Sequence, residues 1–358
     1  MKVCWISNAP APYKVAFMNL LGKEVDLYCL FETKAEKDRE KEWYDYGFAN
    51  FHAIYLNNKN EKETIKQMAK ECDLLINSDY SKKVCMYAVY QFHKQKKKVI
   101  MHADGGIVIP RGIFDKAISY VMRQNDFYLS SGEETDKYYE YYGIPKNKIY
   151  HYHFACMSNL ELAENEKMLI NKSTYRKECG YKEEIILLSV GRQIPGKGYD
   201  VLAKAMIEFP NNIGLYIVGG KSEEKVKQIV EENHLNNIHF VDFKNKEELK
   251  KYYAGADIFV FPTRSDVWGL VVNEAMSFGL PIISTNKCVA AMEFNRKFKN
   301  TEIVEVDNAL ELTKAIKKLV ENKDFVEKLS KNSLSGIKEY SFENMVEDFL
   351  SCFKKIEK

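Results

Sequence analysis

The sequence predicts an α/β fold built from two domains, each with a parallel sheet. Its length of 358 residues favours two domains, because one domain usually takes about 100–200 residues. Apolar residues make up 46% of the chain, and 53 Lys+Arg nearly balance 51 Asp+Glu, which is typical of a globular protein. Short apolar runs alternate with helical segments, as expected for parallel strands joined by helices.

The first 32 residues, MKVCWISNAPAPYKVAFMNLLGKEVDLYCLFE, predict a strand, a proline-containing loop, a helix and a second strand. Asn8, Pro10 and Pro12 make the loop stiff, because proline fixes φ and has no N–H to donate. We therefore expect few backbone contacts to a phosphate in this loop. A rigid loop that only caps the first strand is an equally good interpretation.

A further strand is predicted to end near Met101 in KKKVIMHADGGIVIPRG, where His102 and Asp104 follow it directly. Ligands of open α/β sheets bind at the carboxyl ends of the strands, so either side chain is a candidate for a ligand contact. An aspartate before two glycines is also common turn chemistry. Both interpretations of Asp104 stay open.

The boundary between the domains is expected within residues 156–180, which are polar, rich in charge and without strand character. We place the first domain at 1–165 and the second at 166–340, where apolar runs at IGLYIVGG, IHFVDF, IFVFPT and PIISTN predict strands. Residues 341–358 predict a separate helix that begins at a serine cap. Its apolar residues have helical spacing: Phe342, Met345, Val346, Phe349, Leu350 and Phe353.

The segment IILLSVGRQIPGKGYDVL, residues 185–202, predicts a buried strand, a glycine-rich loop and a helix. The loop contains Arg192 and Lys197. Two cations on such a loop suit a diphosphate, the arginine through its planar fork and the lysine as a point charge. A surface turn with a lysine is common, so this loop alone is weak evidence.

The stretch TRSDVWGLVVNEAMSFGLPIIST, residues 263–285, places two carboxylates, Asp266 and Glu274, around Gly269. A glycine lets the backbone approach a ligand closely, and the first turn of the helix that follows favours an anion. The two carboxylates would then accept hydrogen bonds from sugar hydroxyls beside a phosphate. The same residues are also typical of a buried helix that ends at a glycine and is followed by a proline and a strand.

Together, GRQIPGKG and the D-x7-E pair followed by AMSFGLPIIST resemble the donor half of a retaining glycosyltransferase of family 4. The resemblance covers residues 183–350 and implies the GT-B fold, in which two Rossmann-like domains face a cleft and a C-terminal helix crosses back onto the first domain. It assigns the diphosphate to Arg192 and Lys197, the transferred sugar to Asp266 and the ribose to Glu274. It further implies that the backbone N–H groups of Gly269, Leu270 and Val271 bind the phosphates, and that Gly191 belongs to the binding site of the sugar nucleotide.

The family usually has glutamate where this chain has Asp266, and the shorter side chain shifts the sugar contact, so the donor preference stays open. The N-terminal segment resembles the start of bacterial capsular and exopolysaccharide glycosyltransferases. That resemblance implies acceptor binding in the first domain, with Asn8, Tyr13, His102 and Asp104 as candidates for contact with the sugar or the acceptor.

The resemblance implies transfer of a sugar from a UDP- or GDP-sugar to a hydroxyl of a glycan or a polyprenyl-diphosphate-linked acceptor. Retention would follow from front-face attack, without an enzyme nucleophile, metal or cofactor. A sugar-nucleotide epimerase of the same fold and an inactive nucleotide-sugar-binding module are the alternatives. Residues 240–244, where the family contacts the base, do not distinguish uracil from guanine.

Other classes of function lack their sequence features. The loop SNAPAPYK has no G-x-G-x-x-G for a dinucleotide. A net charge of +2 gives no general case for nucleic-acid binding. The eight scattered cysteines are interpreted as reduced core residues, which favours a cytoplasmic protein. The sequence contains no apolar run of 18 residues, so it predicts no membrane span.

Contact with the inner face of a membrane is a further expectation for residues 82–123, which contain nine Lys/Arg and two acids, Asp104 and Asp115. Such a cluster favours an anionic leaflet, although a solvated basic face would look the same. Ile113, Phe114, Ile118 and Val121 have helical spacing within this region. We interpret this apolar face as directed toward the core.

Overall fold

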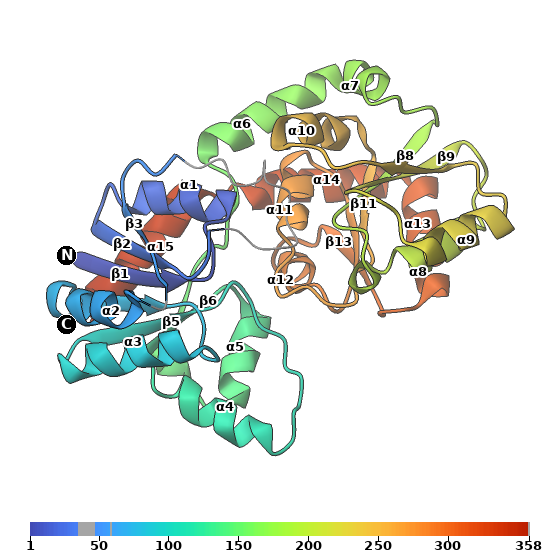
Figure 1. Cartoon of the computed structure of the whole chain (residues 1–358). Helices are drawn as coiled ribbons and strands as arrows, with labels where there is room; N and C mark the ends of the chain where they lie inside the picture. The colour runs from blue at the N-terminus through green and yellow to red at the C-terminus, as the bar shows by residue number, and fades with distance from the viewer. Residues whose placement is uncertain (35–46, 58, 357–358) are drawn as a thin grey trace. The chain divides into compact units, whose positions relative to one another are not determined.

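The computed structural model describes residues 1–34, 47–57 and 59–356, which form two α/β units (Figure 1). Unit 1 consists of Met1–Met157 together with Ser341–Lys358, and unit 2 is Ser158–Tyr340. The division falls at Met157, before the 165/166 position expected from the sequence. The reason is helix α6 (Asn159–Met168), which contacts helices α10 and α11 of unit 2.

Unit 1 contains a parallel sheet of seven strands in the order β3-β2-β1-β4-β5-β6-β7. Its strands are β1 (Lys2–Ser7), β2 (Asp26–Phe31), β3 (His52–Tyr55), β4 (Leu74–Asn77), β5 (Lys98–His102), β6 (Phe127–Ser130) and β7 (Ile149–His151). Its helices are α1 (Pro12–Leu21), α2 (Glu61–Glu71), α3 (Lys83–Lys94), α4 (Phe114–Met122), α5 (Glu133–Tyr141) and α15 (Phe342–Ile356).

Unit 2 contains a parallel sheet of six strands in the order β10-β9-β8-β11-β12-β13. Its strands are β8 (Ile185–Val190), β9 (Ile213–Val218), β10 (Ile238–Val241), β11 (Ile258–Phe261), β12 (Ile282–Thr285) and β13 (Thr301–Val304). Its helices, besides α6, are α7 (Lys172–Glu178), α8 (Tyr199–Met206), α9 (Glu224–Glu232), α10 (Lys246–Gly255), α11 (Leu270–Ser277), α12 (Val289–Phe298), α13 (Ala309–Glu321) and α14 (Lys323–Ile337).

The predicted strands and helices around the sequence motifs are confirmed. Strand β9 is buried at every position, as expected where helices cover both faces of a parallel sheet. Pro12 begins α1, where its fixed φ suits the first helical residue. The hydroxyl of Ser341 accepts a hydrogen bond from the Asn344 backbone N–H at 3.2 Å, which confirms the predicted serine cap of α15.

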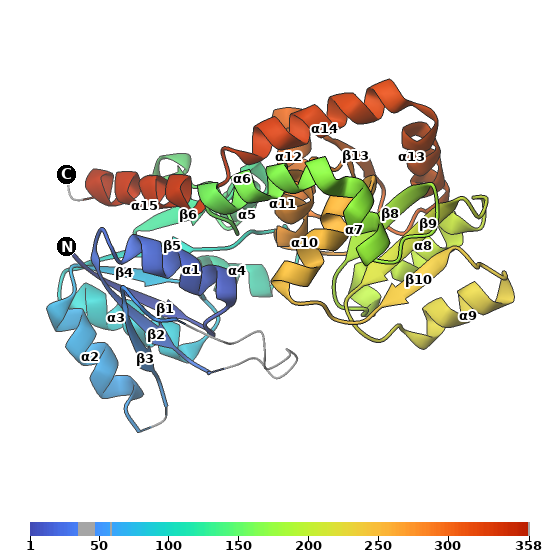
Figure 2. The ribbon, with the colours of Figure 1, turned by 90° about the horizontal axis from the view of Figure 1, so that it is seen from above.

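Helices α2 and α3 lie on one face of the unit 1 sheet, and α1 and α15 lie on the other (Figure 2). Alternate residues of β1 contribute to the two layers of core between them, and Cys4 and Ile6 pack in a cluster with residues of α2 and α3. Trp5 points to the opposite face, where its ring stacks on Phe349 of α15 with centroids 5.6 Å apart and meets Phe17 of α1 at 6.0 Å. The C-terminal helix therefore forms part of the hydrophobic core of unit 1.

The expectation that the apolar face of α4 is directed toward the core was wrong for two of its four residues. Ile113 and Phe114 do not face the core: their side chains are 80% and 69% exposed, and among the nine residues of α4 only Met122 is buried. Ile118 is partly buried and packs with Met122 against the core, as expected. None of the helices in the described ranges is long and apolar enough to cross a membrane.

Both sheets reverse their strand order at one position. In unit 1 the reversal lies between β1 and β4, and in unit 2 it lies between β8 and β11. Loops that leave the carboxyl ends of the two strands at such a reversal diverge and leave a crevice, which is where open α/β sheets bind ligands. The segments after these four strands are therefore the places to examine for a site.

Candidate functional site

In unit 2, the loops after β8 and β11 contain the two sequence motifs and are bound to each other. The Gly196 carbonyl oxygen accepts hydrogen bonds from the Arg264 N–H at 2.8 Å and from the Thr263 hydroxyl at 3.1 Å. Gly198 has φ +72°, and a Cβ built on it would lie 2.1 Å from the Pro262 carbonyl oxygen. Only glycine permits this backbone contact without strain, so the loops form one surface.

Lys197 and Asp266 meet across these loops. The Lys197 Nζ lies 2.6 Å from the Asp266 Oδ2, with about a fifth of each side chain exposed (18% and 20%). The same Nζ lies 4.9 Å from the centre of the Phe261 ring. A lysine ammonium has three donors, so this pair leaves hydrogen-bonding capacity for a second anion. Arg192 is exposed on the same loop, and the described residues form no ion pair with it.

Gly269 begins helix α11 with φ +104°, and a Cβ on it would lie 2.9 Å from the Cys288 Sγ. As the N-cap residue, Gly269 has no side chain with which to cap the helix. Leu270 and Val271, the first two helical residues, are partly exposed. A helix N-terminus with a glycine at its start lets an anion approach the backbone closely.

Glu274 lies in the second turn of α11 and is partly exposed. Burial raises the pKa of its carboxyl above the usual value, although a hydrogen bond from Tyr253 acts in the opposite direction. The Tyr253 hydroxyl donates this bond at 2.8 Å, and its ring stacks on Phe278 with centroids 5.6 Å apart. Tyr253 therefore positions the Glu274 carboxyl from a neighbouring helix.

Sequence reasoning missed the residue that holds the two loops together. Arg264 donates to both carboxylate oxygens of Asp200 at 2.9 and 3.0 Å, to Asp307 at 2.6 Å, and to the Pro195 carbonyl oxygen. Arg264 lies within the TRSD motif, but its partners are 43 to 69 residues away in the chain. No local spacing indicates them, so only the folded structure reveals this role.

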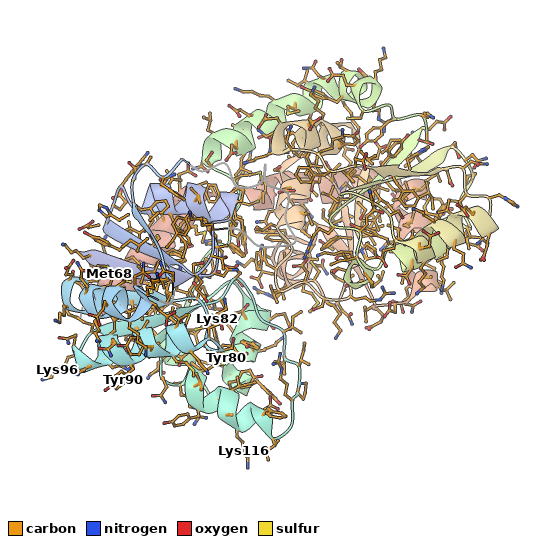
Figure 3. The ribbon with its side chains drawn as sticks, in the orientation of Figure 1. Met68, Tyr80, Lys82, Tyr90, Lys96 and Lys116 are labelled. Atoms are coloured by element: carbon orange, nitrogen blue, oxygen red, sulfur yellow. The ribbon has the colours of Figure 1, made fainter. Side chains whose placement is uncertain are left out.

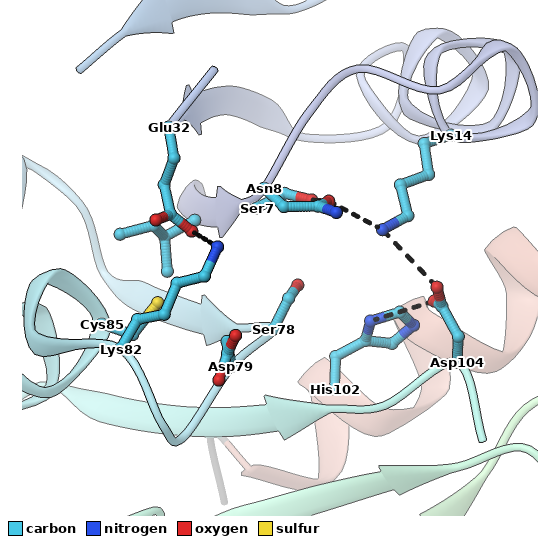
Figure 4. Close-up of a pocket in the computed structure, with 11 residues that line it drawn as sticks. Ser7, Asn8, Lys14, Glu32, Ser78, Asp79, Lys82, Cys85, His102 and Asp104 are labelled. Atoms are coloured by element: carbon cyan, nitrogen blue, oxygen red, sulfur yellow. Dashed lines mark hydrogen bonds and ion pairs between the residues drawn. The ribbon is translucent and has the colours of Figure 1, made fainter. Parts of the chain in front are cut away.

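Unit 1 contains a polar cavity of about 180 Å³ near the reversal between β1 and β4 (Figure 4). Beside it, the structure links three of the four predicted residues, Asn8, Tyr13 and Asp104, in one network that includes Lys14. The Asp104 Oδ2 accepts a hydrogen bond from the Tyr13 hydroxyl at 3.0 Å and lies 3.5 Å from the Lys14 Nζ. The Lys14 Nζ also lies 3.5 Å from the Asn8 Oδ1. The cavity is lined by Ile6, Ser7, Asn8, Lys14, Glu32, Ser78, Asp79, Lys82, Cys85, His102 and Asp104.

Two ion pairs lie in this cavity, between Lys14 and Asp104 and between Lys82 and Glu32. Burial alone would raise the pKa of the Asp104 carboxyl, but Lys14, His102 and Tyr13 together lower it, so that Asp104 is ionised. Lys82, which lines the cavity, pairs with Glu32 at 2.8 Å. Sequence reasoning did not assign Lys14 or Glu32 to a site, because each is an ordinary charged residue in its local context, and it counted Lys82 only within the basic cluster of residues 82–123.

His102 is 3% exposed and packs against Trp5 with ring centroids 5.1 Å apart. Burial lowers the pKa of its imidazole to about 4, so the ring is neutral at neutral pH. Its Nδ1 lies 3.9 Å from the Asp104 Oδ1, which is beyond hydrogen-bond distance. Its Nε2 is buried and forms no hydrogen bond within the described part of the chain. A neutral histidine of this kind can donate or accept a hydrogen bond, but it supplies no charge.

Among the described residues, no three His, Cys, Asp or Glu side chains gather where they could hold a metal ion. The groups that gather at the two loops of unit 2 are lysine, arginine, backbone N–H groups and carboxylates. In unit 2 these groups suit a diphosphate that is joined to a hydroxyl-rich group.

Comparison with known proteins supports this interpretation of unit 2. The family model for glycosyl transferases group 1 matches residues 171–335. The lipopolysaccharide glucosyltransferase WaaG of Escherichia coli K12 is 29% identical over 130 residues, which cover 35% of this chain and 34% of that protein. A 41.2 kDa protein in the cps region of Klebsiella pneumoniae is 29% identical over 213 residues, 56% of each chain. The chain spans about half the length, or less, of most of the curated relatives it matches.

Solved structures show the same fold over the whole chain. The crystal structure of Anabaena Alr3699/HepE in complex with UDP superposes with a TM-score of 0.81 over 99% of this chain and 100% of that chain, at 13% identity. The segment that the family model matches contains both loops of unit 2. The two parallel α/β sheets of the chain are consistent with this match. Residues 171–335 of unit 2, nearly half of the chain, therefore match the group 1 glycosyl transferases (family GT4), and the chain has the GT-B fold.

Proposed function

We propose that the protein is a retaining, metal-independent hexosyltransferase that moves a sugar from a UDP- or GDP-sugar to a hydroxyl of a glycan or lipid-linked oligosaccharide. The observation that carries the proposal is the Lys197–Asp266 pair at 2.6 Å. The pair joins the loop after β8, which suits a diphosphate, to the carboxylate of Asp266 just before the N-terminus of α11. This puts a cation for the leaving group beside an acceptor for sugar hydroxyls.

Each donor residue then has one role. Arg192 and Lys197 bind the diphosphate, and Gly191 and Gly269 let it approach the backbone, where the N–H groups of Leu270 and Val271 complete its contacts. Asp266 accepts hydrogen bonds from the transferred sugar. Glu274, oriented by Tyr253 at 2.8 Å, accepts hydrogen bonds from the ribose.

The reaction breaks the bond between the sugar C1 and the diphosphate oxygen. Negative charge grows on the leaving phosphate while positive charge grows on the sugar ring. Lys197, Arg192 and the N-terminus of α11 stabilise the leaving charge, which is the part that a metal ion plays in other diphosphate enzymes. The acceptor hydroxyl attacks from the face that the diphosphate leaves, and a phosphate oxygen takes its proton. The configuration at C1 is then retained without an enzyme nucleophile.

Unit 1 is proposed to contact the acceptor or the transferred sugar through Asn8, Tyr13, His102 and Asp104. The hydrogen bond from Tyr13 to Asp104 at 3.0 Å and the cavity beside it support this role, because paired carboxylates and hydroxyls bind sugars well. The names of WaaG and of the cps-region protein support an acceptor in lipopolysaccharide or capsule synthesis. Such an acceptor is held by lipid, so we place the protein in the cytoplasm at the inner face of the membrane.

A first experiment measures binding of UDP, GDP, ADP and CMP by calorimetry, with and without EDTA. Tight binding of UDP or GDP that EDTA does not change is the expected result. If none of the four nucleotides binds, the assignment of the donor site to unit 2 is contradicted. In a second step, the protein is incubated with the sugar form of the nucleotide that binds and with an extract that contains lipid-linked acceptors. The products of this incubation separate the alternatives. Transfer supports the proposal, epimerised sugar without acceptor indicates an epimerase, and binding without any reaction indicates an inactive module.

A further inference from the structure

Arg264 connects the two loops that carry the Lys197–Asp266 pair at a point close to both partners. Its backbone N–H donates to the Gly196 carbonyl oxygen at 2.8 Å, and its guanidinium donates to the Pro195 carbonyl oxygen. In the sequence, these two acceptors directly precede Lys197, and Arg264 itself stands two residues before Asp266. A shift of one loop along the other would therefore break bonds of Arg264 as well as separate the pair.

Two carboxylates bind the guanidinium of Arg264. Asp200, in the first turn of α8, accepts hydrogen bonds from it at 2.9 and 3.0 Å and from Lys225 of α9 at 2.7 Å. Burial alone would raise the pKa of Asp200, but Lys225 and Arg264 lower it, so the carboxylate is ionised. Asp307, in the segment after β13, accepts a further bond at 2.6 Å. The charge of Arg264 is therefore balanced by carboxylates outside the proposed donor site.

Lys197 depends on its surroundings for a defined position. A lysine ammonium is a point charge on a flexible four-carbon stem, and Gly196 and Gly198 flank Lys197 in the sequence, where glycine restrains the backbone least. A cation stabilises a leaving phosphate most when it is held in place before the reaction. Whatever fixes the backbone on either side of Lys197 therefore affects how well it binds the donor.

We propose that Arg264 is the positioning residue of the donor site, because it fixes the loop after β8 against the loop after β11 so that Lys197 and Asp266 act on one ligand. The inference rests on the donor role proposed for Lys197 and names the residue through which that role depends on the fold. It predicts that Lys197 contributes fully to nucleotide binding only where Arg264 is present. A merely structural Arg264 would affect stability and leave the contribution of Lys197 unchanged.

Unit 2 contains a matched control at the opposite ends of the same two strands. Arg176 donates to the Glu184 carbonyl oxygen at 3.0 Å and to the Asp257 carboxylate. Asp257 also pairs with Lys172 at 2.8 Å. Glu184 and Asp257 directly precede β8 and β11, so this cluster lies at the amino ends of the strands, whereas both loops lie at the carboxyl ends. The side chains of Arg176 and Arg264 are 25% and 28% exposed, so Arg176→Gln removes a comparable set of bonds from the same unit.

The test is a double-mutant cycle measured by calorimetric titration with UDP and GDP. Lys197→Ala is made in the wild type, in Arg264→Gln and in Arg176→Gln, and the Tm of every variant is recorded. In the wild type and in Arg176→Gln, Lys197→Ala should raise the Kd about tenfold or more. In Arg264→Gln, the same change should raise the Kd about threefold or less, because Lys197 is no longer held in place.

Two further variants complete the cycle. Arg264→Lys keeps the positive charge and provides the comparison if Arg264→Gln does not fold. Because its single ammonium cannot reach both Pro195 and Asp307, the effect of Lys197→Ala should again fall to about threefold or less. Lys116→Gln removes one exposed cation from unit 1, where Figure 3 shows the Lys116 side chain directed outward. In this variant Lys197→Ala should keep its full effect, which separates positioning from net charge.

The outcomes distinguish the inference from the proposed function. An equal effect of Lys197→Ala in the wild type and in the Arg264 variants, whatever their Tm, would overturn the inference and leave the donor site in place. A weakened effect in Arg176→Gln or Lys116→Gln would also overturn it, because lost stability or lost charge would then be a sufficient cause. If Lys197→Ala does not change the Kd in the wild type, the donor site itself is contradicted and the inference fails with it.

Discussion

Replacing Lys197 with alanine removes the cation that the proposed function assigns to the leaving diphosphate. In the structure its Nζ lies 2.6 Å from the Asp266 Oδ2, and the side chain is 18% exposed. The variant therefore loses a partly buried charge and leaves Asp266 without this partner. Both consequences act on the donor: the diphosphate loses an attractive contact, and the carboxylate that remains repels it.

The magnitude of the two effects differs between binding and folding. A hydrogen bond to a charged group contributes about 1.5–3 kcal/mol, so the Kd for UDP or GDP should rise about 10- to 150-fold. An ion pair with this exposure contributes only about 0–1 kcal/mol to folding. The expected fall in Tm is therefore at most about 4 °C.

The assay is calorimetric titration with UDP and GDP, preceded by a thermal melt. Lys318→Ala is the matched control, because Lys318 forms an ion pair with Glu302 at 2.9 Å on α13, away from both loops. It should leave the Kd unchanged. Lys197→Arg keeps the charge but alters its shape, so its Kd is expected between those of the wild type and Lys197→Ala. A folded Lys197→Ala protein with the Kd of the wild type for both nucleotides would refute the assignment of this loop to the diphosphate.

Three further predictions concern other residues of the two sites. Burial raises the pKa of Glu274 above 4.5, so the folded state binds this proton more readily than the unfolded state, and wild-type stability falls as pH rises through that window. In urea titrations, the unfolding free energy of Glu274→Gln should therefore increase relative to that of the wild type between pH 4.5 and pH 7. The variant should nevertheless bind UDP or GDP more weakly. An equal difference in unfolding free energy between variant and wild type at pH 4.5 and pH 7 would contradict the prediction. Asp104→Asn should lower transfer at least tenfold while the nucleotide Kd stays the same, and a changed Kd would instead link unit 1 to the nucleotide. Gly269→Ala should lose about 1–3 kcal/mol of stability, because φ +104° and a 2.9 Å contact with the Cys288 Sγ strain any side chain there; an unchanged Tm would show that the backbone relaxes.

The sequence predicted the elements around each motif because the signals for them are local. A glycine between a strand and a helix, as at Gly191 and Gly269, marks a loop whatever the rest of the chain does. The pairing of Lys197 with Asp266 spans 69 residues, and no periodicity encodes it. The same holds for Arg264, whose carboxylate partners come from α8 and from the segment after β13.

Helix α4 illustrates a different limit. Helical spacing indicated correctly that Ile113, Phe114 and Ile118 belong to one amphipathic segment. Spacing shows which residues share a side of a helix, but it does not show which side the rest of the protein covers. In α4, the attached side carries Ile118 and Met122 together with Asp115 and Ser119, polar residues that a search for apolar periodicity passes over.

The place of α15 in unit 1 has a consequence for the order in which the chain folds. The Phe342 N–H donates to the Met157 carbonyl oxygen at 2.9 Å, so the two ends of unit 2 meet where unit 1 resumes. Unit 2 is one uninterrupted segment and can fold as soon as it leaves the ribosome. Unit 1 must wait until residues 341–356 emerge, roughly 10–40 s after Met157 at about 5–20 residues per second. During that time Trp5 and Phe17 lack their aromatic partner Phe349, so this part of the unit 1 core stays incomplete until the end of synthesis.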